Sequence, residues 1–286
     1  MIKFTKMEGL GNDYVYIDCT EKSNEEIDYI SKCACKISNK HFGVGSDGLI
    51  LICKSSRADF KMQMYNKDGS QAQMCGNGIR CVGKYVYDKG LTNKKSITVE
   101  TLAGIKKLDF DIKDNKVVNV TVNMGKPILQ AELIPCVADT IVKNDANEIS
   151  HVRLHVLDRD FDFTCVSMGN PHAIAIVDNV DNFDVEKYGK IVELDIHFPQ
   201  KTNVEFVEIL DMSTIKMRVW ERGAGETLAC GTGASASAVA CILNELVDGN
   251  EEIKVKLLGG DLIIKWDKDV YMTGPAKIVF EGEYYD

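Results

Sequence analysis

Hydrophobic and polar positions alternate along this chain in short runs, and helical spacing is found in only a few segments. Alternating or continuously apolar runs of four to eight residues are typical of β-strands. They predict strands along the whole chain, at residues 2–7, 14–18, 49–54, 60–66, 97–101, 105–112, 117–124, 152–157, 161–168, 173–177, 204–209, 214–220, 253–258, 261–266, 270–272 and 277–284. Because strands dominate and crossover helices are few, we predict an α+β fold with mostly antiparallel sheets.

Helical spacing predicts helices in four segments. Ser23 and Glu26 form a capping-box signal, which opens a helix whose apolar positions continue to Ile37. A second helix is predicted near residues 185–194, and two more over residues 77–89 and from 230 to about 247. In the last of these, residues 234–243 are small and apolar on nearly every side, so we expect that helix to be buried all round.

The helices predicted over residues 77–89 and from residue 230 begin with the same short motif. The chain reads Met74-Cys75-Gly76-Asn77-Gly78 at one helix start and Ala229-Cys230-Gly231-Thr232-Gly233 at the other. Glycine permits close approach of the backbone to a ligand, and a helix N-terminus favours an anion, either a thiolate or a carboxylate. Such a position also lowers the pKa of a thiol. We therefore predict two reactive cysteines, Cys75 and Cys230.

A constant offset of 155 residues relates the two motifs and the segments before them. This offset aligns several further pairs, namely Lys61-Met62 with Lys216-Met217, Tyr65 with Trp220, and Asn66 with Glu221. In addition, Gly11-Asn12-Asp13 resembles Gly169-Asn170-Pro171, each before a strand. We predict an internal duplication. The duplication predicts two pseudo-symmetric domains. The first is residues 1–126, completed by the strand 277–286, and the second is residues 127–276. Each is a sheet or barrel around its own central helix, and the active site lies in the cleft between them.

Composition and charge narrow the classes of function. The 286 residues carry a net charge of −9, which argues against non-specific binding to nucleic acid or to an anionic membrane. The N-terminus has no apolar run of signal-peptide length, so a cytoplasmic protein is expected. The ten cysteines lack Cys-x-x-Cys spacing, and most of them are expected in the core. Residues 43–48 match Gly-x-Gly-x-x-Gly, but a helix precedes them and a strand follows, the reverse of a dinucleotide site.

Two thiols on opposite faces of one carbon could invert its stereochemistry. One thiolate would remove a proton from one face, and the other group, as a thiol, would return a proton to the opposite face. The carbon acid would be the α-carbon of an amino acid, which is far less acidic than a thiol of pKa about 8.5. Donors preorganised at two helix N-termini could stabilise the resulting carbanion.

At these residues the chain closely resembles the diaminopimelate epimerase family over essentially its full length. The motifs that carry the resemblance are Gly11-Asn12-Asp13-Tyr14, Asn66-x-Asp68-Gly69-Ser70, Met74-Cys75-Gly76-Asn77-Gly78-Ile79-Arg80-Cys81, Gly169-Asn170-Pro171-His172, Asn203-Val204-Glu205, Glu221-Arg222-Gly223 and Ala229-Cys230-Gly231-Thr232-Gly233. The resemblance implies epimerisation of LL-diaminopimelate to the meso form, in lysine and peptidoglycan precursor synthesis. It implies no cofactor and no metal, and it suggests a homodimer.

The resemblance also implies a role for individual residues. Cys75 and Cys230 would be the two acid/base groups, with His172 and Glu221 tuning their protonation. The residues that it implies in substrate binding are Asn12, Asn66, Gly76, Asn77, Asn170, Asn203, Glu221, Arg222, Gly231 and Thr232. Arg222 beside Glu221 suits a ligand with a distal carboxylate and a distal ammonium. One position departs from the pattern, since some family members carry a substrate-contacting glutamine where this chain has Gly48.

Two other functions are weighed against this one. The first is a racemase of a cyclic amino acid such as proline or hydroxyproline, from the same structural superfamily. Those enzymes resemble this chain in their two cysteines, but Asn77 and Ala229 stand where they typically carry histidine and proline. The second is a non-enzymatic metal or redox protein that uses the cysteine-rich first half, for which bound zinc or iron is expected.

Overall fold

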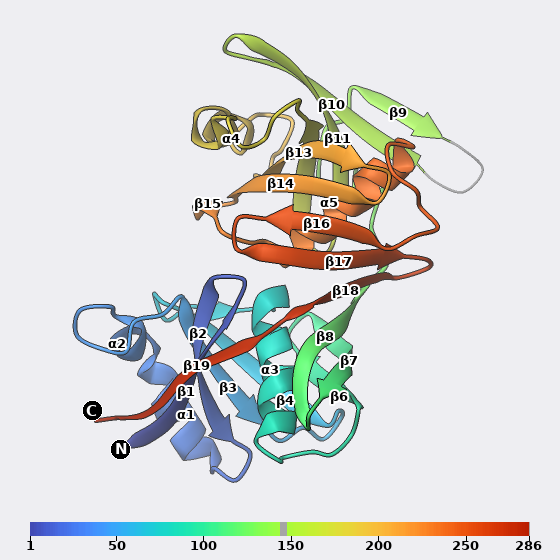
Figure 1. The fold of residues 1–286 in the computed structure, drawn as a ribbon. Helices are drawn as coiled ribbons and strands as arrows, with labels where there is room; N and C mark the ends of the chain where they lie inside the picture. The colour runs from blue at the N-terminus through green and yellow to red at the C-terminus, as the bar shows by residue number, and fades with distance from the viewer. Residues whose placement is uncertain (144–147, 286) are drawn as a thin grey trace. The chain divides into compact units, whose positions relative to one another are not determined.

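The computed structural model of this protein describes residues 1–143 and 148–285, which form two compact units. Unit 1 contains residues 1–123 and 273–286, and unit 2 contains residues 124–272. Unit 1 is therefore built from both ends of the chain (Figure 1). The domain boundary after residue 126 stays a prediction.

Unit 1 is formed mainly by strands. Its elements are β1 (Ile2–Gly9), β2 (Asn12–Cys19), α1 (Asn24–Lys32), α2 (Ala34–Ser38), β3 (Gly48–Cys53), β4 (Phe60–Asn66), β5 (Gln71–Ala72), α3 (Gly76–Asp88), β6 (Ser96–Thr101), β7 (Gly104–Lys113), β8 (Lys116–Gly125) and β19 (Lys277–Tyr284). Strand β1 lies between β2 and β19, and both pairings are antiparallel. The pairs β2–β3 and β4–β6 are parallel, and the others described here are antiparallel, including β3–β4, β6–β7 and β7–β8.

Helices cover both faces of the sheet in unit 1. Helices α1 and α2 contact β3 on one face, where Leu49 and Leu51 join a buried apolar cluster. Helix α3 contacts β1 and β2, and Gly78 of α3 lies close to Ile50 of β3. Every residue of β3 is buried as a result, which explains why its sequence is continuously apolar and does not alternate.

Unit 2 repeats this plan with different side chains. Its elements are β9 (Thr140–Lys143), β10 (Glu148–Val156), β11 (Arg159–Ser167), β12 (Pro171–Ile176), α4 (Val185–Val192), β13 (Asn203–Asp211), β14 (Thr214–Glu221), β15 (Gly225–Thr227), α5 (Gly231–Leu243), β16 (Ile253–Leu257), β17 (Gly260–Trp266) and the start of β18 (Val270–Pro275). Strands β8 and β18 cross the boundary in the chain, since residues 124–125 of β8 belong to unit 2 and residues 273–275 of β18 belong to unit 1. Helix α5 contacts six strands, namely β11, β12, β13, β14, β16 and β17. Residues 233–241 of α5 are all buried, which confirms the helix predicted to be buried all round.

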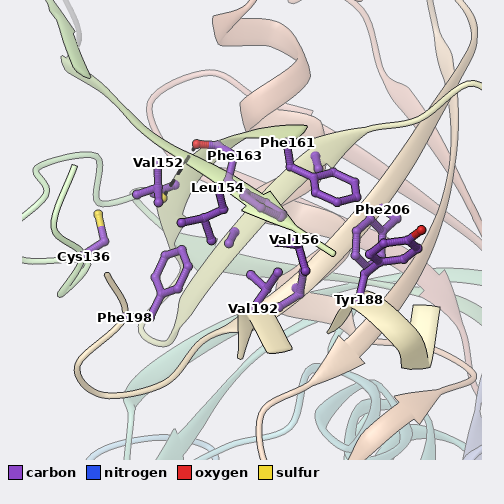
Figure 2. Packing of buried hydrophobic residues seen from close by; sticks show 14 of the residues in the cluster. Cys136, Val152, Leu154, Val156, Phe161, Phe163, Tyr188, Val192, Phe198 and Phe206 are labelled. Carbon is purple, nitrogen blue, oxygen red and sulfur yellow. Dashed lines mark hydrogen bonds between the residues drawn. The ribbon is translucent and has the colours of Figure 1, made fainter. Parts of the chain in front are cut away.

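A second apolar layer in unit 2 packs α4 against the sheet. Figure 2 shows this cluster, in which Phe161, Phe206 and Tyr188 lie together. The rings of Phe183 and Phe206 are 4.3 Å apart between centroids, and those of Phe161 and Tyr188 are 5.4 Å apart. Aromatic pairs at these separations contribute beyond their buried area, so the layer fixes strands β11 and β13 relative to α4.

The predicted α+β fold and duplication are confirmed. Helices α3 and α5 have the same length and begin at Gly76 and Gly231, which are 155 residues apart. The parallel pair β2–β3 recurs as β12–β13, and the parallel pair β4–β6 recurs as β14–β16. Each unit is thus a strand-rich layer system around one central helix.

Several element boundaries differ from the predictions. The capping box at Ser23 is present, but the single helix predicted to Ile37 is broken at Cys33 into α1 and α2. Helix α5 ends at Leu243, and not near residue 247, because the side chain of Asn244 donates to the carbonyl of Ala240 and ends the helix there. The short strands β5, β9 and β15 carry too few residues for an alternating pattern and were not predicted.

Candidate active site

Both motif cysteines are the N-cap residues of the central helices. Cys75 caps α3 with φ −129° and ψ 123°, and Cys230 caps α5 with φ −118° and ψ 112°. Each sulfur accepts a hydrogen bond from the backbone N–H three residues later, at 3.4 Å from Gly78 N and from Gly233 N. These N–H groups favour a thiolate, as do the positive ends of the helix dipoles.

The Cys75 half-site, in unit 1, comprises Asn12, Tyr14, Asp47, Cys75 and Gly78. The thiol of Cys75 donates to Asn12 Oδ1 at 3.1 Å, and Asn12 Nδ2 donates to Asp47 Oδ2 at 2.7 Å. The backbone N–H of Asp13 also donates to Asp47 Oδ2, at 3.1 Å. Asp47 therefore fixes the Asn12 amide so that its oxygen faces the sulfur.

The other predicted site residues of unit 1 lie around this group. Gly76 and Asn77 are buried in the first turn of α3. Asn66 is at the end of β4, where its amide donates to Ser70 Oγ at 3.0 Å. Its strand partner is Gly48. The sequence-predicted set of unit 1 is thus brought to one end of α3 and its neighbouring strands.

Gly48 cannot carry a side chain on this backbone. A Cβ atom built there would be 2.1 Å from the carbonyl oxygen of Tyr65 and 2.9 Å from Cε1 of Tyr14. A clash with backbone at that distance requires the strand to move. The glutamine contact of some family members is therefore incompatible with this packing of β3 against β4.

Arg80 supports the first turn of α3. It is fully buried, and its guanidinium donates to the carbonyls of Gly76 and Pro275, both at 3.2 Å. Burial lowers the pKa of Arg80, an effect opposed by the charges of Cys81 and Cys75. A buried cation one turn after Cys75 adds to the local preference for a thiolate.

The Cys230 half-site, in unit 2, comprises Asn170, His172, Glu205, Glu221, Cys230 and Thr232. Most of these side chains form one hydrogen-bonded chain. The distances along it are 3.4 Å from Cys230 Sγ to Thr232 Oγ1, 3.3 Å from Thr232 Oγ1 to Asn170 Nδ2, 3.2 Å from Asn170 Oδ1 to His172 Nε2, and 2.7 Å from His172 Nδ1 to Glu205 Oε1. The chain links the sulfur to a carboxylate four side chains away.

The orientation of this chain follows from its donors and acceptors. With the Asn170 oxygen toward His172, Nε2 must donate, and the Asn170 NH₂ group donates to Thr232. The hydroxyl of Thr232 is then available to donate to the Cys230 sulfur. A carboxamide cannot readily pass a proton along, so the chain orients its members and is not a proton wire.

Glu205 ends the chain in a dry environment. The side chains of Glu205 and His172 are both fully buried. Among the described residues, Glu205 Oε2 has no hydrogen-bond partner. A Cβ atom on Gly233 would be 2.6 Å from Glu205 Oε1, so the glycine at the start of α5 makes room for this carboxylate.

The pKa of Cys230 runs against the prediction for a helix N-terminus. Burial raises it well above the ordinary value of a thiol, and the charges of Glu221 and Glu205 raise it further. Hydrogen bonds from Thr232 and Gly233 lower it by less. Burial also raises the pKa of Glu221, whose carboxylate accepts a hydrogen bond from the Thr227 hydroxyl. In unit 2 alone, the structure therefore favours the thiol at Cys230.

The remaining predicted residues of unit 2 lie beside the chain. Asn203 is buried, its Nδ2 donates to the carbonyl of Pro171 at 2.8 Å, and its Oδ1 accepts from the backbone N–H of Arg222 at 3.0 Å. The guanidinium of Arg222 is exposed and donates to the carbonyl of Gln200 at 3.1 Å. Gly231 lies in the first turn of α5, where its carbonyl accepts from Ser235.

Sequence reasoning did not assign Tyr14, Asp47 or Glu205 to the site. Tyr14 and Glu205 were inside motifs that it did identify, and each lies two residues beyond a predicted asparagine. Alternate residues of a strand point to the same face, so this spacing could have indicated them. Asp47 is in a loop, and nothing in its spacing indicates a contact with Asn12.

Among residues 1–143 and 148–285, no group of three or more His, Cys, Asp or Glu side chains is placed to hold a metal ion. No helix in these ranges is both long and apolar enough to cross a membrane.

The sequence profile of the family described as diaminopimelate epimerase matches residues 4–130 and 164–279. A diaminopimelate epimerase of Methanococcus maripaludis is 56% identical over 285 residues, covering 99% of each chain. One from Acetivibrio thermocellus is also 56% identical, over 99% of this chain and 98% of the relative.

More distant solved structures share the fold. A phenazine biosynthesis protein of Bacillus anthracis superposes with a TM-score of 0.69 at 18% identity, over 98% of each chain. A hydroxyproline epimerase of Agrobacterium vitis superposes with a TM-score of 0.64 at 14% identity, over 98% of this chain and 91% of the other. At such low identity these likenesses bear on the fold alone.

Proposed function

The chain belongs to the diaminopimelate epimerase family, and we propose that it converts LL-diaminopimelate to meso-diaminopimelate with Cys75 and Cys230 as paired acid and base. The observation that carries the proposal is the duplicated N-cap cysteine, with equivalent backbone geometry and equivalent N–H contacts in the two units. Racemisation of a cyclic amino acid such as proline is the alternative that the proton-exchange experiment distinguishes.

The proposed reaction moves one proton to carbon and one from it. A thiolate at one cysteine takes the α-proton, and the electron pair of the broken C–H bond stays on the α-carbon and its carboxylate. The thiol of the other cysteine then gives its proton to the opposite face of that carbon. The two cysteines end with their protonation states exchanged. No external oxidant, reductant or cofactor is needed to balance these steps.

The environments of the two thiols support different starting states. At Cys230, burial and two carboxylates favour the protonated thiol. At Cys75, the buried guanidinium of Arg80 supports the thiolate once the thiol has given up the proton that it donates to Asn12 Oδ1. We therefore assign proton removal from the LL substrate to Cys75 and proton return to Cys230. His172 and Glu221 tune the Cys230 side of the exchange.

Substrate binding is proposed to use the groups around both helix starts. The N-terminal turns of α3 and α5, at Gly76, Asn77, Gly231 and Thr232, would hold the α-carboxylate and stabilise the carbanion. Arg222 would pair with the distal carboxylate in its fixed fork, and Glu221 with the distal ammonium. The proposed polar contacts to the rest of the substrate are Asn12, Asn66, Asn170 and Asn203.

The biological setting is part of the same proposal. Diaminopimelate epimerisation belongs to lysine and peptidoglycan precursor synthesis, and we place the enzyme in the cytoplasm. We also propose a homodimer. Val279 and Phe280 of β19 are about half exposed, at 55% and 46%, which supports an apolar contact with a second copy.

The test is proton exchange in deuterated water followed by proton NMR. With LL-diaminopimelate, the wild type should lose the α-proton signal and produce the meso isomer. Cys75→Ser and Cys230→Ser should each reduce turnover by about 10²–10⁴-fold, the usual contribution of a positioned acid or base. Cys35→Ser changes an exposed cysteine and serves as the control. Exchange into free proline, but not into diaminopimelate, would contradict the proposal.

A further inference from the structure

We infer that Tyr14 is a positioning residue for the Cys75 thiolate, to which it donates its hydroxyl group. The inference deepens the proposed function, because it rests on Cys75 acting as a base. Four features of unit 1 support it.

The first feature is the face of β2 on which Tyr14 lies. Residues 12, 14 and 16 point to the same face of the strand. Asn12 contacts Cys75 Sγ at 3.1 Å, and the hydroxyl of Tyr16 donates to the carbonyl of Gly78 at 3.1 Å. Tyr14 is therefore bracketed by two residues that contact the first turn of α3. Its hydroxyl lies close enough to Cys75 and Asn12 for both side chains to shift its pKa.

The second feature is the space that Gly48 leaves for the ring. Tyr14 and Gly48 are register partners in the parallel pair β2–β3. A Cβ atom on Gly48 would be 2.9 Å from Tyr14 Cε1, so any side chain there would displace the ring. Tyr14 is only 5% exposed, and a buried tyrosine hydroxyl needs an internal partner. The packing of β3 thus fixes the ring on the face of β2 that Tyr14 shares with Asn12.

The third feature is the internal duplication. In unit 2 the equivalent parallel pair matches His172 with Asn203, and Asn203 is 155 residues after Gly48. Asn12 and Asn170 precede Tyr14 and His172 by two residues each. Tyr14 therefore occupies in unit 1 the place that His172 occupies in unit 2. In unit 2 that ring is linked to Cys230 through Asn170 and Thr232.

The fourth feature is the protonation state of Tyr14, which decides whether its hydroxyl donates or accepts a hydrogen bond. Burial, the charge of Cys75 and the charge of Asp47 raise the pKa of Tyr14 far above its ordinary value. The phenol keeps its proton throughout the working range, so it is a donor to the sulfur. Within unit 1, the other titratable or charged groups that act on this cluster include Glu8, Tyr16, Asp47, Arg80 and Cys81.

The experiment measures alkylation of Cys75 by iodoacetamide as a function of pH, read by peptide mass spectrometry on the full-length protein. Tyr14→Phe removes only the hydroxyl. We expect the pH midpoint for Cys75 alkylation to rise by about one unit or more, since a hydrogen bond to a charged group is lost. The acid limb of kcat/KM should move upward by the same amount, with activity recovering at high pH.

Two controls show whether the shift of the Cys75 midpoint is specific to the Tyr14 hydroxyl. Tyr85→Phe removes another buried tyrosine hydroxyl of the same unit, on α3 ten residues beyond Cys75, and should leave the Cys75 midpoint unchanged. Exposed Cys35, in the same molecule, reports the reactivity of the reagent. An unchanged Cys75 midpoint in folded Tyr14→Phe protein would overturn the inference.

A second measurement tests the inference if Tyr14→Phe does not fold. Replacing Tyr14 with 3,5-difluorotyrosine keeps the ring and makes the hydroxyl a stronger donor, so the Cys75 midpoint should move down. No movement would again overturn the inference. The alkylation readout needs no substrate. A shifted midpoint in a protein that does not exchange diaminopimelate would therefore reject the proposed function and leave the role of Tyr14 standing.

Discussion

At the scale of single residues, the buried pair His172–Glu205 differs from the other histidine–carboxylate pairs of the chain. His155 and Asp160 are as close, at 2.6 Å, but their side chains are 67% and 89% exposed. His172 and Glu205 are 2.7 Å apart and are both fully buried. Water can replace either partner of the exposed pair, whereas nothing replaces a partner of the buried pair.

Glu205→Ala should therefore lower the free energy of unfolding of unit 2 by about 3–5 kcal/mol, the usual cost of leaving one member of a buried pair alone. Both tryptophans, Trp220 and Trp266, lie in unit 2, so urea denaturation followed by tryptophan fluorescence reports on that unit. Asp160→Ala breaks the exposed pair and should leave the transition unchanged. Equal effects of the two variants would show that burial of Glu205 is not the cause.

The raised pKa of Cys230 predicts how stability depends on pH. A folded thiol with a raised pKa keeps its proton where the unfolded thiol, with a pKa of about 8.5, has lost it. The stabilisation is complete below about pH 8.5, and above it decreases by up to about 1.4 kcal/mol per pH unit until the folded thiol ionises. Cys230→Ala lacks this pH-dependent stabilisation. The free energy of unfolding of the wild type minus that of Cys230→Ala should therefore fall above about pH 8.5. A constant difference from pH 7 to 10 would contradict the assignment.

At the scale of elements, α3 and α5 have the same backbone start but different surroundings. The glycine three residues after each cysteine is Gly78 in α3 and Gly233 in α5. A Cβ atom on Gly78 would meet Cδ1 of Ile50 at 2.8 Å, which is the end of a flexible side chain. A Cβ atom on Gly233 would meet the carboxylate of Glu205 at 2.6 Å and the sulfur of Cys230 at 3.3 Å.

Alanine at these two positions should have different effects on activity. Gly78→Ala should keep most activity, because Ile50 can rotate away and alanine favours the helix. Gly233→Ala should reduce kcat/KM by about 10²-fold, because it displaces the carboxylate and the sulfur together. Steady-state kinetics on the two variants makes the comparison, with circular dichroism as the check on folding. Similar losses in both would mean that the first turns tolerate substitution alike.

The sequence was sufficient for the elements that repeat and for the residues that begin them. The offset of 155 residues predicted the α3–α5 equivalence, since glycine and cysteine at a helix start are distinctive. It was insufficient for the break at Cys33, where the apolar spacing continues through the interruption. It also could not show that burial and two carboxylates outweigh the helix N-terminus at Cys230, because those groups come from distant strands.

At the scale of the whole molecule, unit 1 is completed by the last strand. Strand β19 pairs with β1 from Ile2 opposite Tyr284 to Glu8 opposite Lys277. The carbonyl of Pro275, just before β19, accepts from buried Arg80, which in turn holds the carbonyl of Gly76. The first turn of the Cys75 helix is therefore supported by residues about 200 positions later in the chain.

Deletion of residues 277–286 should therefore damage unit 1 and spare unit 2. We expect loss of epimerase activity and reaction of the buried thiols of Cys19 and Cys53 with a thiol reagent in the native buffer. The urea transition of the unit 2 tryptophans should be unchanged. Retained protection of both thiols in the truncated protein would show that β1 does not need its partner.

During synthesis, unit 1 is the first of the two units to be started and the last to be completed. Unit 1 contains residues 1–123 but lacks β19 until residues 277–284 have been made, while unit 2 is contiguous. At about 5–20 residues per second, the ribosome needs roughly 10–30 s to make the residues after Asn123. During that interval the outer edge of β1 has its backbone groups unpaired with β19. Nascent-chain chaperones would meet that edge, and the second half of the protein would be the first to finish folding.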